Sequence, residues 1–147
     1  MENSENMVFI IHRTHDMLKR CEDKVFGEYN LTAEQYAVLT AIKYLDGPVR
    51  VTDIARRVTR SVNSITMIVD RMVRAGLLTR VRDEKDRRTV HVGITRKAAA
   101  LLNPAVLAGQ EFIQKTLSQV SHEDEQALIR LLETVQRDVE AHSKQNG

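Results

Sequence analysis

Short polar side chains and arginines occupy one side of a predicted helix that begins after Ser61, which is placed to cap it. The opposite side carries a stripe at the α-helical period that is predicted to be buried: Val62, Ile65, Val69 and Met72. The polar side carries Arg60, Asn63, Ser64, Met67, Arg71 and Arg74, and the cap residue Ser61 is predicted to lie with them in the binding surface. Hydroxyl, amide and guanidinium groups on one face match a polyanion that presents base edges.

The first turn of this helix carries the residues best suited to contact bases. Asn63 can pair bidentately with adenine, and Ser64 can bond to several bases. Thr66 and Met67 can contact a thymine methyl group. Three arginines are better placed for phosphates, namely Arg60, Arg71 and Arg74. For any single residue, an ordinary exposed helix face explains the pattern equally well, so the prediction rests on the group.

A basic hairpin follows the helix at residues 77–95, LLTRVRDEKDRRTVHVGIT. Two alternating stretches, typical of half-buried strands, flank a charged turn. The turn residues with a predicted role are Arg82, Asp83, Lys85, Asp86, Arg87 and Arg88. An arginine at a hairpin tip fits a narrow minor groove, and Asp83 or Asp86 could hold that arginine straight by a bidentate pair. The alternative is a solvated turn with compensating charges.

Charge is concentrated in the same part of the chain. Residues 50–97 hold thirteen Lys/Arg and five Asp/Glu, a net +8, although the whole chain of 147 residues carries only +2. Hydrophobic residues at 42% are too many for a disordered chain, and aromatics at 4% without Trp argue against stacking on single-stranded bases. The sequence therefore predicts a winged helix-turn-helix that binds double-stranded DNA.

Three further elements complete the predicted winged helix. A helix is capped by Thr32 with Gln35 in a capping box and ends at Gly47-Pro48. A short helix is predicted to be capped by Thr52. Residues 50–51 are predicted to form a short strand that closes a three-stranded sheet.

Long helices are predicted on both sides of this unit. One spans residues 5–29, one runs from 96 to about 120 behind Thr95 with Pro104 inside it, and one begins at Ser121. Their apolar stripes need cover, either from the winged helix itself or, more economically, from a second copy. The expected fold is mainly α with a small β-wing. Its expected parts are an N-terminal dimerisation helix (1–31), the winged helix-turn-helix (32–95) and C-terminal dimerisation helices (96–147).

These residues resemble the MarR family of bacterial and archaeal regulators across nearly the whole chain. The most specific part is the D-x-R-x-x-x-V-x-I-T pattern at Asp86, Arg88, Val92, Ile94 and Thr95. The resemblance implies an obligate homodimer joined through its terminal helices and bound to a palindrome near a promoter. It also implies that Arg87 is the minor-groove finger. In many members a small, often phenolic or anionic, ligand releases the DNA, and other members sense oxidants or metals.

The sequence does not select among these effectors. Cys21 lies on an apolar stripe, where a buried, inert thiol is the usual outcome and redox sensing is the alternative. His12 and His15 could share a metal with Asp16 or Glu22, but two histidines without a cysteine cluster are a poor zinc signature. The residues that could line a ligand cleft are His12, Arg13, Tyr36, Tyr44 and His91. No metal site and no cofactor is predicted.

Three classes of function compete for this chain. The favoured one is a sequence-specific transcriptional regulator, most often a repressor, relieved by a small-molecule effector. The second is a winged-helix protein-interaction module without DNA binding, which would not need an arginine-tipped wing. An enzyme is not expected, because the sequence has no phosphate loop and no nucleophile beside a base. Without a basic leader or a span of about 20 apolar residues, a cytoplasmic location and no membrane partner are expected.

Overall fold

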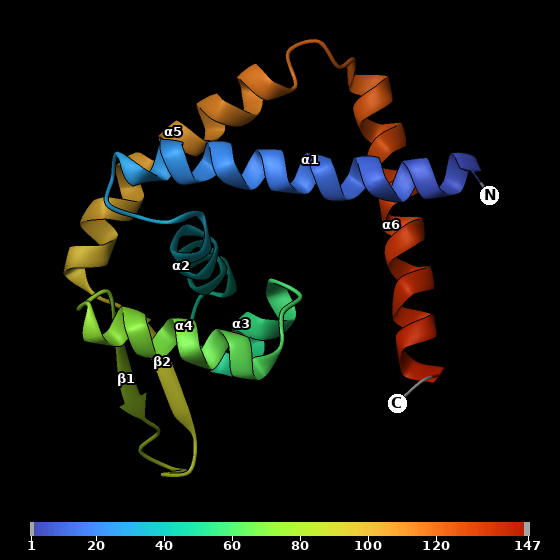
Figure 1. Ribbon diagram of the computed structural model, residues 1–147. Coiled ribbons are helices and arrows are strands. Elements are labelled where there is room, and N and C mark those ends of the chain that lie inside the picture. The colour runs from blue at the N-terminus through green and yellow to red at the C-terminus, as the bar shows by residue number, and fades with distance from the viewer. Residues whose placement is uncertain (1, 146–147) are drawn as a thin grey trace. The chain divides into compact units, whose positions relative to one another are not determined.

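The computed structural model describes residues 2–145 as six helices and a two-stranded hairpin (Figure 1). The predicted dimerisation segments extend to residues 1, 146 and 147, which lie outside the described residues. The elements in chain order are α1 (Glu2–Gly27), α2 (Ala33–Leu45), α3 (Val51–Arg57), α4 (Val62–Arg74), β1 (Leu78–Arg82), β2 (Val90–Ile94), α5 (Arg96–Thr116) and α6 (His122–Gln145). The predicted fold class, mainly α with a small β-wing, is confirmed.

An aliphatic core joins α2, α3, α4 and the hairpin. Its fully buried side chains come from all four, among them Leu39, Ile54, Ile65, Met72 and Leu78. The strands are antiparallel, and Leu78 pairs with Ile94. Because β1 follows α4 after only Ala75, Gly76 and Leu77, the hairpin stays beside the helix (Figure 1). This core fixes the positions of α4 and of the wing.

Four of the predicted caps begin helices as expected. Thr32 and Gln35 exchange two hydrogen bonds of 3.0 Å at the start of α2. Ser61 Oγ accepts the Ser64 N–H at 3.1 Å at the start of α4, and Thr95 Oγ1 accepts the Ala98 N–H at 3.1 Å at the start of α5. Ser121 does the same for Asp124 in α6. These signals are local, so the sequence alone predicts them.

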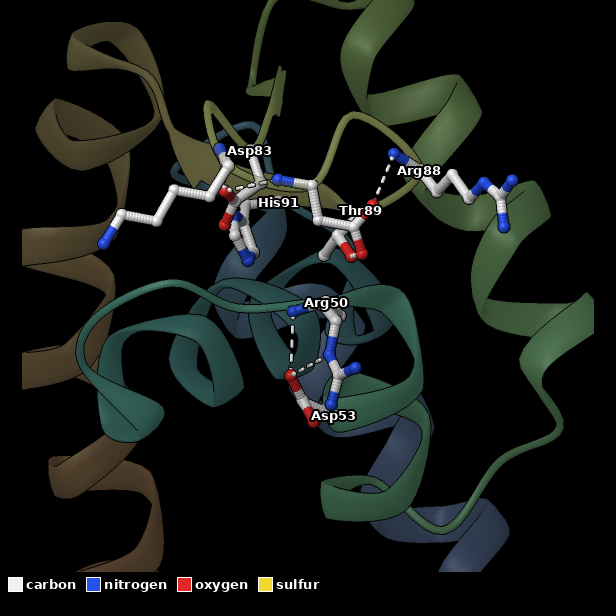
Figure 2. Close-up of polar contacts among 8 residues, drawn as sticks. Arg50, Asp53, Asp83, Arg88, Thr89 and His91 are labelled. Carbon is white, nitrogen blue, oxygen red and sulfur yellow. Dashed lines mark hydrogen bonds and ion pairs between the residues drawn. The ribbon is translucent and has the colours of Figure 1, made fainter.

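The predictions at residues 50–52 were wrong. Arg50 is the N-cap of α3, and Val51 is its first helical residue, so neither forms a strand and Thr52 is not the cap. The Asp53 carboxylate accepts the Arg50 N–H at 2.9 Å and so satisfies the backbone donor of the residue that precedes the helix (Figure 2). The third pairing of the sheet exists only as a single bridge between Val49 and Val92.

The buried stripe of α4 also differs from the prediction at one position. Val62 is 46% exposed, and Ile68 is buried instead. Val62 is the first residue of α4 and lies outside the core, which on this helix begins at Ile65. The buried residues of α4 are therefore Ile65, Ile68, Val69 and Met72.

The chain divides into two compact units, Met1–Phe112 and Ile113–Gly147. In the second unit, α6 buries none of its side chains and leaves apolar residues exposed, among them Leu128, Ile129, Leu131 and Val139. In the first unit, α1 buries Phe26 but leaves Met7, Val8, Phe9, Ile10 and Met17 exposed. Among residues 2–145, no helix combines the length and the apolar content needed to cross a membrane.

Candidate nucleic-acid interface

The polar face of α4 is open to solvent as predicted. Asn63, Arg71 and Arg74 are exposed, and Met67 is 57% exposed. Thr66 is half-buried, and its hydroxyl donates to the Val62 carbonyl at 2.7 Å. Because that hydroxyl is already engaged, Thr66 offers a partner its methyl group and an oxygen lone pair but no donor.

Arg60 lies just before α4 and connects it to α2. Its Nη2 donates to Glu34 Oε1 at 3.0 Å and to Ser64 Oγ at 3.1 Å. Arg60 was predicted to contact a phosphate. In this chain its guanidinium is instead bonded to a carboxylate and to a hydroxyl of α4. The sequence gives little sign of this contact, because Glu34 and Arg60 are 26 residues apart.

A second pair joins α4 to the wing. Arg80 Nη2 on β1 donates to Asp70 Oδ1 on α4, with both side chains partly exposed. Neither residue was among the predicted site residues, since the pattern of Asp70 on its helix gives no hint of a partner on the following strand. The pair joins α4 to the strand that leads into the turn at residues 82–88.

The wing turn, residues 82–88, is held by two carboxylates (Figure 2). Asp83 Oδ1 accepts the N–H groups of Lys85 at 2.7 Å and Asp86 at 3.2 Å. Asp86 accepts the Arg88 N–H at 3.1 Å and the Thr89 hydroxyl at 3.0 Å. The predicted brace between one of these aspartates and Arg87 was wrong, because both carboxylates bind the turn itself and no ion pair within residues 2–145 includes Arg87.

The cations of the wing turn are free to meet a partner. Arg82, Lys85, Arg87 and Arg88 are all exposed. Figure 2 shows the Arg88 guanidinium extending away from the turn while its backbone N–H points to Asp86. A rigid turn that carries exposed guanidinium groups can enter a groove without first becoming ordered.

The turn favours the charged form of Asp83. Hydrogen bonds from the Lys85 and Asp86 N–H groups hold its pKa below the ordinary value, and His91 contributes in the same direction. His91 Nδ1 lies 3.9 Å from Asp83 Oδ2, at the base of the turn (Figure 2). The histidine, predicted as a cleft residue, therefore faces the wing carboxylate.

The other predicted cleft residues lie in different surroundings. Tyr36 stacks on Phe26 with ring centroids 3.7 Å apart. The Arg57 guanidinium lies over the Tyr44 ring, with Arg57 Cζ 3.9 Å from the ring centroid. Tyr44 also lines a pocket of about 310 Å³ between α2 and α3. His12 and Arg13 are exposed on α1. The five residues remain a predicted set, which the described chain does not gather into one pocket.

One carboxyl group and one phenol with shifted pKa values were missed by sequence reasoning. Burial raises the pKa of Glu22, Asp23 adds to the effect, and His15 opposes it. Burial and then Glu22 raise the pKa of Tyr36. The sequence suggested Glu22 only as a metal ligand, because its position in the helical pattern does not predict that it is partly buried.

The residues named for a metal site or a redox-active thiol all lie on α1. Within the part of the chain that the structure describes, no three His, Cys, Asp or Glu side chains gather as a metal site. His15 Nδ1 lies 3.4 Å from Asp16 Oδ1, both on the exposed side of α1. The expectation of a buried Cys21 was wrong for the single chain, where the thiol is exposed, because α1 is not covered along this stretch.

Comparison with known proteins gives a consistent result. Residues 31–90 match the MarR family. The HTH-type transcriptional regulator PecS of Dickeya dadantii (strain 3937) is 30% identical over 129 residues, which cover 86% of this chain and 78% of PecS. The fold is similar to that of an organohalide-sensing transcriptional regulator bound to 2,4-dichlorophenol, with 20% identity, a TM-score of 0.86 and coverage of 94% and 82%. It is also similar to S. aureus MepR in complex with DNA, with 18% identity, a TM-score of 0.80 and coverage of 90% and 95%.

Proposed function

The chain belongs to the MarR family of transcriptional regulators, and from that premise we propose that it is a homodimeric repressor. It binds a palindromic operator with two copies of α4 in successive major grooves and is released by a small-molecule effector. It carries out no catalysis of its own. The observation that carries the proposal is the exposed face of α4 beside a wing turn that its own carboxylates hold rigid.

The proposed contacts divide by chemistry. Asn63, Ser64 and the side chains of Thr66 and Met67 meet base edges. Arg71 and Arg74 contact phosphates, and the arginines of the wing turn enter the minor groove. Concentrating a net +8 on residues 50–97 supports this docking, because phosphate neutralisation supplies most of the affinity for DNA.

Dimerisation is supported by the exposed apolar side chains of α1 and α6. A chain on its own would leave Phe9, Leu131 and Val139 at 60% exposure or more. Covering such a surface with a second copy is the usual solution, and two-fold symmetry then places half-sites about 10 base pairs apart. The division into an N-terminal dimerisation helix, a winged helix and C-terminal dimerisation helices belongs to the same proposal.

Effector release is supported by a ligand-bound protein of similar fold. The organohalide-sensing structure holds 2,4-dichlorophenol, an acidic phenol. We extend to this chain only the idea of a small-molecule effector, with His12, Arg13, Tyr36, Tyr44 and His91 as the residues to test. An effector releases the DNA only to the extent that it binds the DNA-free form of the protein more tightly than the DNA-bound form.

Selection of bound sequences from a random DNA pool by the purified full chain tests the proposal. A palindrome with half-sites one helical turn apart is the expected result. Enrichment of no sequence would contradict it and would favour a winged-helix module that binds proteins. Elution from immobilised DNA separates the two cases, since a DNA-binding protein elutes at high salt and an interaction module elutes early.

A further inference from the structure

Val62 is an exposed aliphatic side chain in the first turn of α4. Its side chain was expected in the core, yet it is 46% exposed, whereas Ile65, the next residue of that stripe, is 1% exposed. Isolated apolar side chains are common on protein surfaces and need no explanation by themselves. This one lies in the part of α4 that, in the proposed docking, reaches base edges in the major groove.

Local contacts fix the position of Val62. The Ser61 hydroxyl accepts the Ser64 N–H and the Ser61 carbonyl accepts the Ile65 N–H, both at 3.1 Å. The Val62 carbonyl accepts the Thr66 hydroxyl at 2.7 Å. A valine in a helix has one strongly preferred side-chain rotamer. The two methyl groups of Val62 therefore lose little conformational freedom when a partner binds.

Thr66 lies beside Val62 on the helix. Residues four apart are neighbours on one side of an α-helix, and Thr66 is half-buried there. Its hydroxyl proton is used by the Val62 carbonyl, so Thr66 presents no hydrogen-bond donor next to the valine. Together the two side chains form a small surface without a donor, on a helix face that otherwise carries an amide and arginines.

We propose that Val62 is a specificity-determining residue that contacts the 5-methyl group of one thymine in each half-site, with Thr66 beside it. Among the groups that the four bases present in the major groove, the thymine methyl is the apolar one. A hydrogen-bonding base edge placed against the valine would lose water without gaining a partner. The proposal rests on the proposed docking of α4 in the major groove. It assigns a role in base recognition to a residue that the sequence pattern placed in the core.

Met67 is also exposed, at 57%, and was itself predicted to contact a thymine methyl. A methionine side chain has three rotatable bonds and adapts to partners of different shape. The branched, stiff side chain of Val62 adapts less. We therefore expect Val62 to distinguish a methylated base from an unmethylated one more sharply than Met67 does.

The test replaces each thymine of the selected operator, one position at a time, by deoxyuridine, which lacks the methyl group and keeps the same pairing edge. At one position in each half-site, the full wild-type chain is expected to bind the deoxyuridine operator about two- to fivefold more weakly, the effect of removing one buried methyl group. Val62→Ala should bind the thymine and deoxyuridine operators equally at that position. Val62→Ile should keep the wild-type ratio, because it keeps the branched apolar side chain.

A second measurement separates the methyl group from the rest of the base. Cytosine at the same position should weaken binding, and 5-methylcytosine should recover part of the loss with the wild type but not with Val62→Ala. The matched control is Val81→Ala, which truncates a valine on β1 that is 59% exposed. It should leave the ratio of thymine to deoxyuridine affinity unchanged. Both truncations change exposed side chains, so the fold is expected to stay intact.

Two results would overturn the inference. In one, no replacement of thymine by deoxyuridine changes the affinity of the wild type. In the other, Val62→Ala keeps the wild-type ratio at every position, as Val81→Ala should. If the wild type selects no sequence at all, the proposed function fails as well. If it selects a palindrome but Val62→Ala leaves every methyl dependence intact, this inference alone fails.

Discussion

Arg80 on β1 pairs with Asp70 on α4, so an ion pair joins the strand that leads into the wing turn to this helix. The two side chains are 37% and 43% exposed, and the pair lies on the surface, outside the core. A helix that enters the major groove and a turn that enters the minor groove must keep a fixed separation to bind one half-site together. This pair is placed to maintain that separation.

Asp70→Asn should therefore affect DNA binding more than folding. The free energy of unfolding in urea should fall by less than about 1 kcal/mol, as for other surface pairs. The ratio of operator to random-DNA affinity should fall several-fold, since the helix and the wing are no longer held in register. Adding Arg80→Gln to Asp70→Asn should cause little further loss. Fully additive losses would show that the two residues act independently.

Gly109 allows α5 to approach the stacked pair of Phe26 and Tyr36. A Cβ at residue 109 would lie 3.0 Å from Tyr36 Oη and 3.3 Å from the Phe26 ring. Gly109→Ala should destabilise the chain by about 1–2 kcal/mol, because overpacking outweighs the gain in helix propensity. Gly27→Ala is the control, since a Cβ at residue 27 would meet no atom within 4 Å. Thermal unfolding of both variants checks this, and equal midpoints would contradict the packing argument.

The wing turn should loosen in acid. Hydrogen bonds from Lys85 and Asp86 lower the pKa of Asp83 below 3.8, so the stabilisation is present above that pH and is lost as the pH falls through the lowered value. The protection of the Lys85 and Asp86 amides against hydrogen exchange should fall as the pH drops through the lowered pKa of Asp83. Asp83→Ala should show fast exchange already at neutral pH. Unchanged exchange in this variant would mean that the carboxylate does not order the turn.

Local signals explain why so much of the fold was predictable from the sequence. Thr32 with Gln35, Ser61 and Thr95 act within one turn of the chain, and the predicted strand at residues 90–94 places Val92 in the core. The contacts of Arg60 with Glu34 and of Arg80 with Asp70 depend on how helices pack, which no local pattern encodes. Thr52 is not a cap because α3 begins one residue earlier, at Val51, with the Asp53 carboxylate accepting the Arg50 N–H. The site was therefore predicted as a set of residues but not as a network.

Leu131 on α6 tests the proposed dimer. The side chain is 65% exposed in the single chain, and Leu131→Glu would place a charge in an interface that covers it. The wild type is expected to sediment as a dimer at micromolar concentration and the variant as a monomer or an aggregate. Glu133→Gln, a surface change on the same helix, should leave the dimer intact. A variant that remains dimeric would show that α6 meets its partner through another face.

Arg87 in the wing turn tests the minor-groove contact. The side chain is exposed and has no carboxylate partner within 4.0 Å among residues 2–145, so it is free to enter a groove. Arg87→Ala should cost most affinity on operators whose flanks are rich in A·T, where a narrow groove concentrates negative potential. Arg87→Lys should recover only part of the loss, because an ammonium group is more strongly hydrated than a guanidinium. Equilibrium binding to operators that differ only in flanking A·T content checks both variants. Equal losses on A·T-rich and G·C-rich flanks would show that the wing contacts only the phosphate backbone.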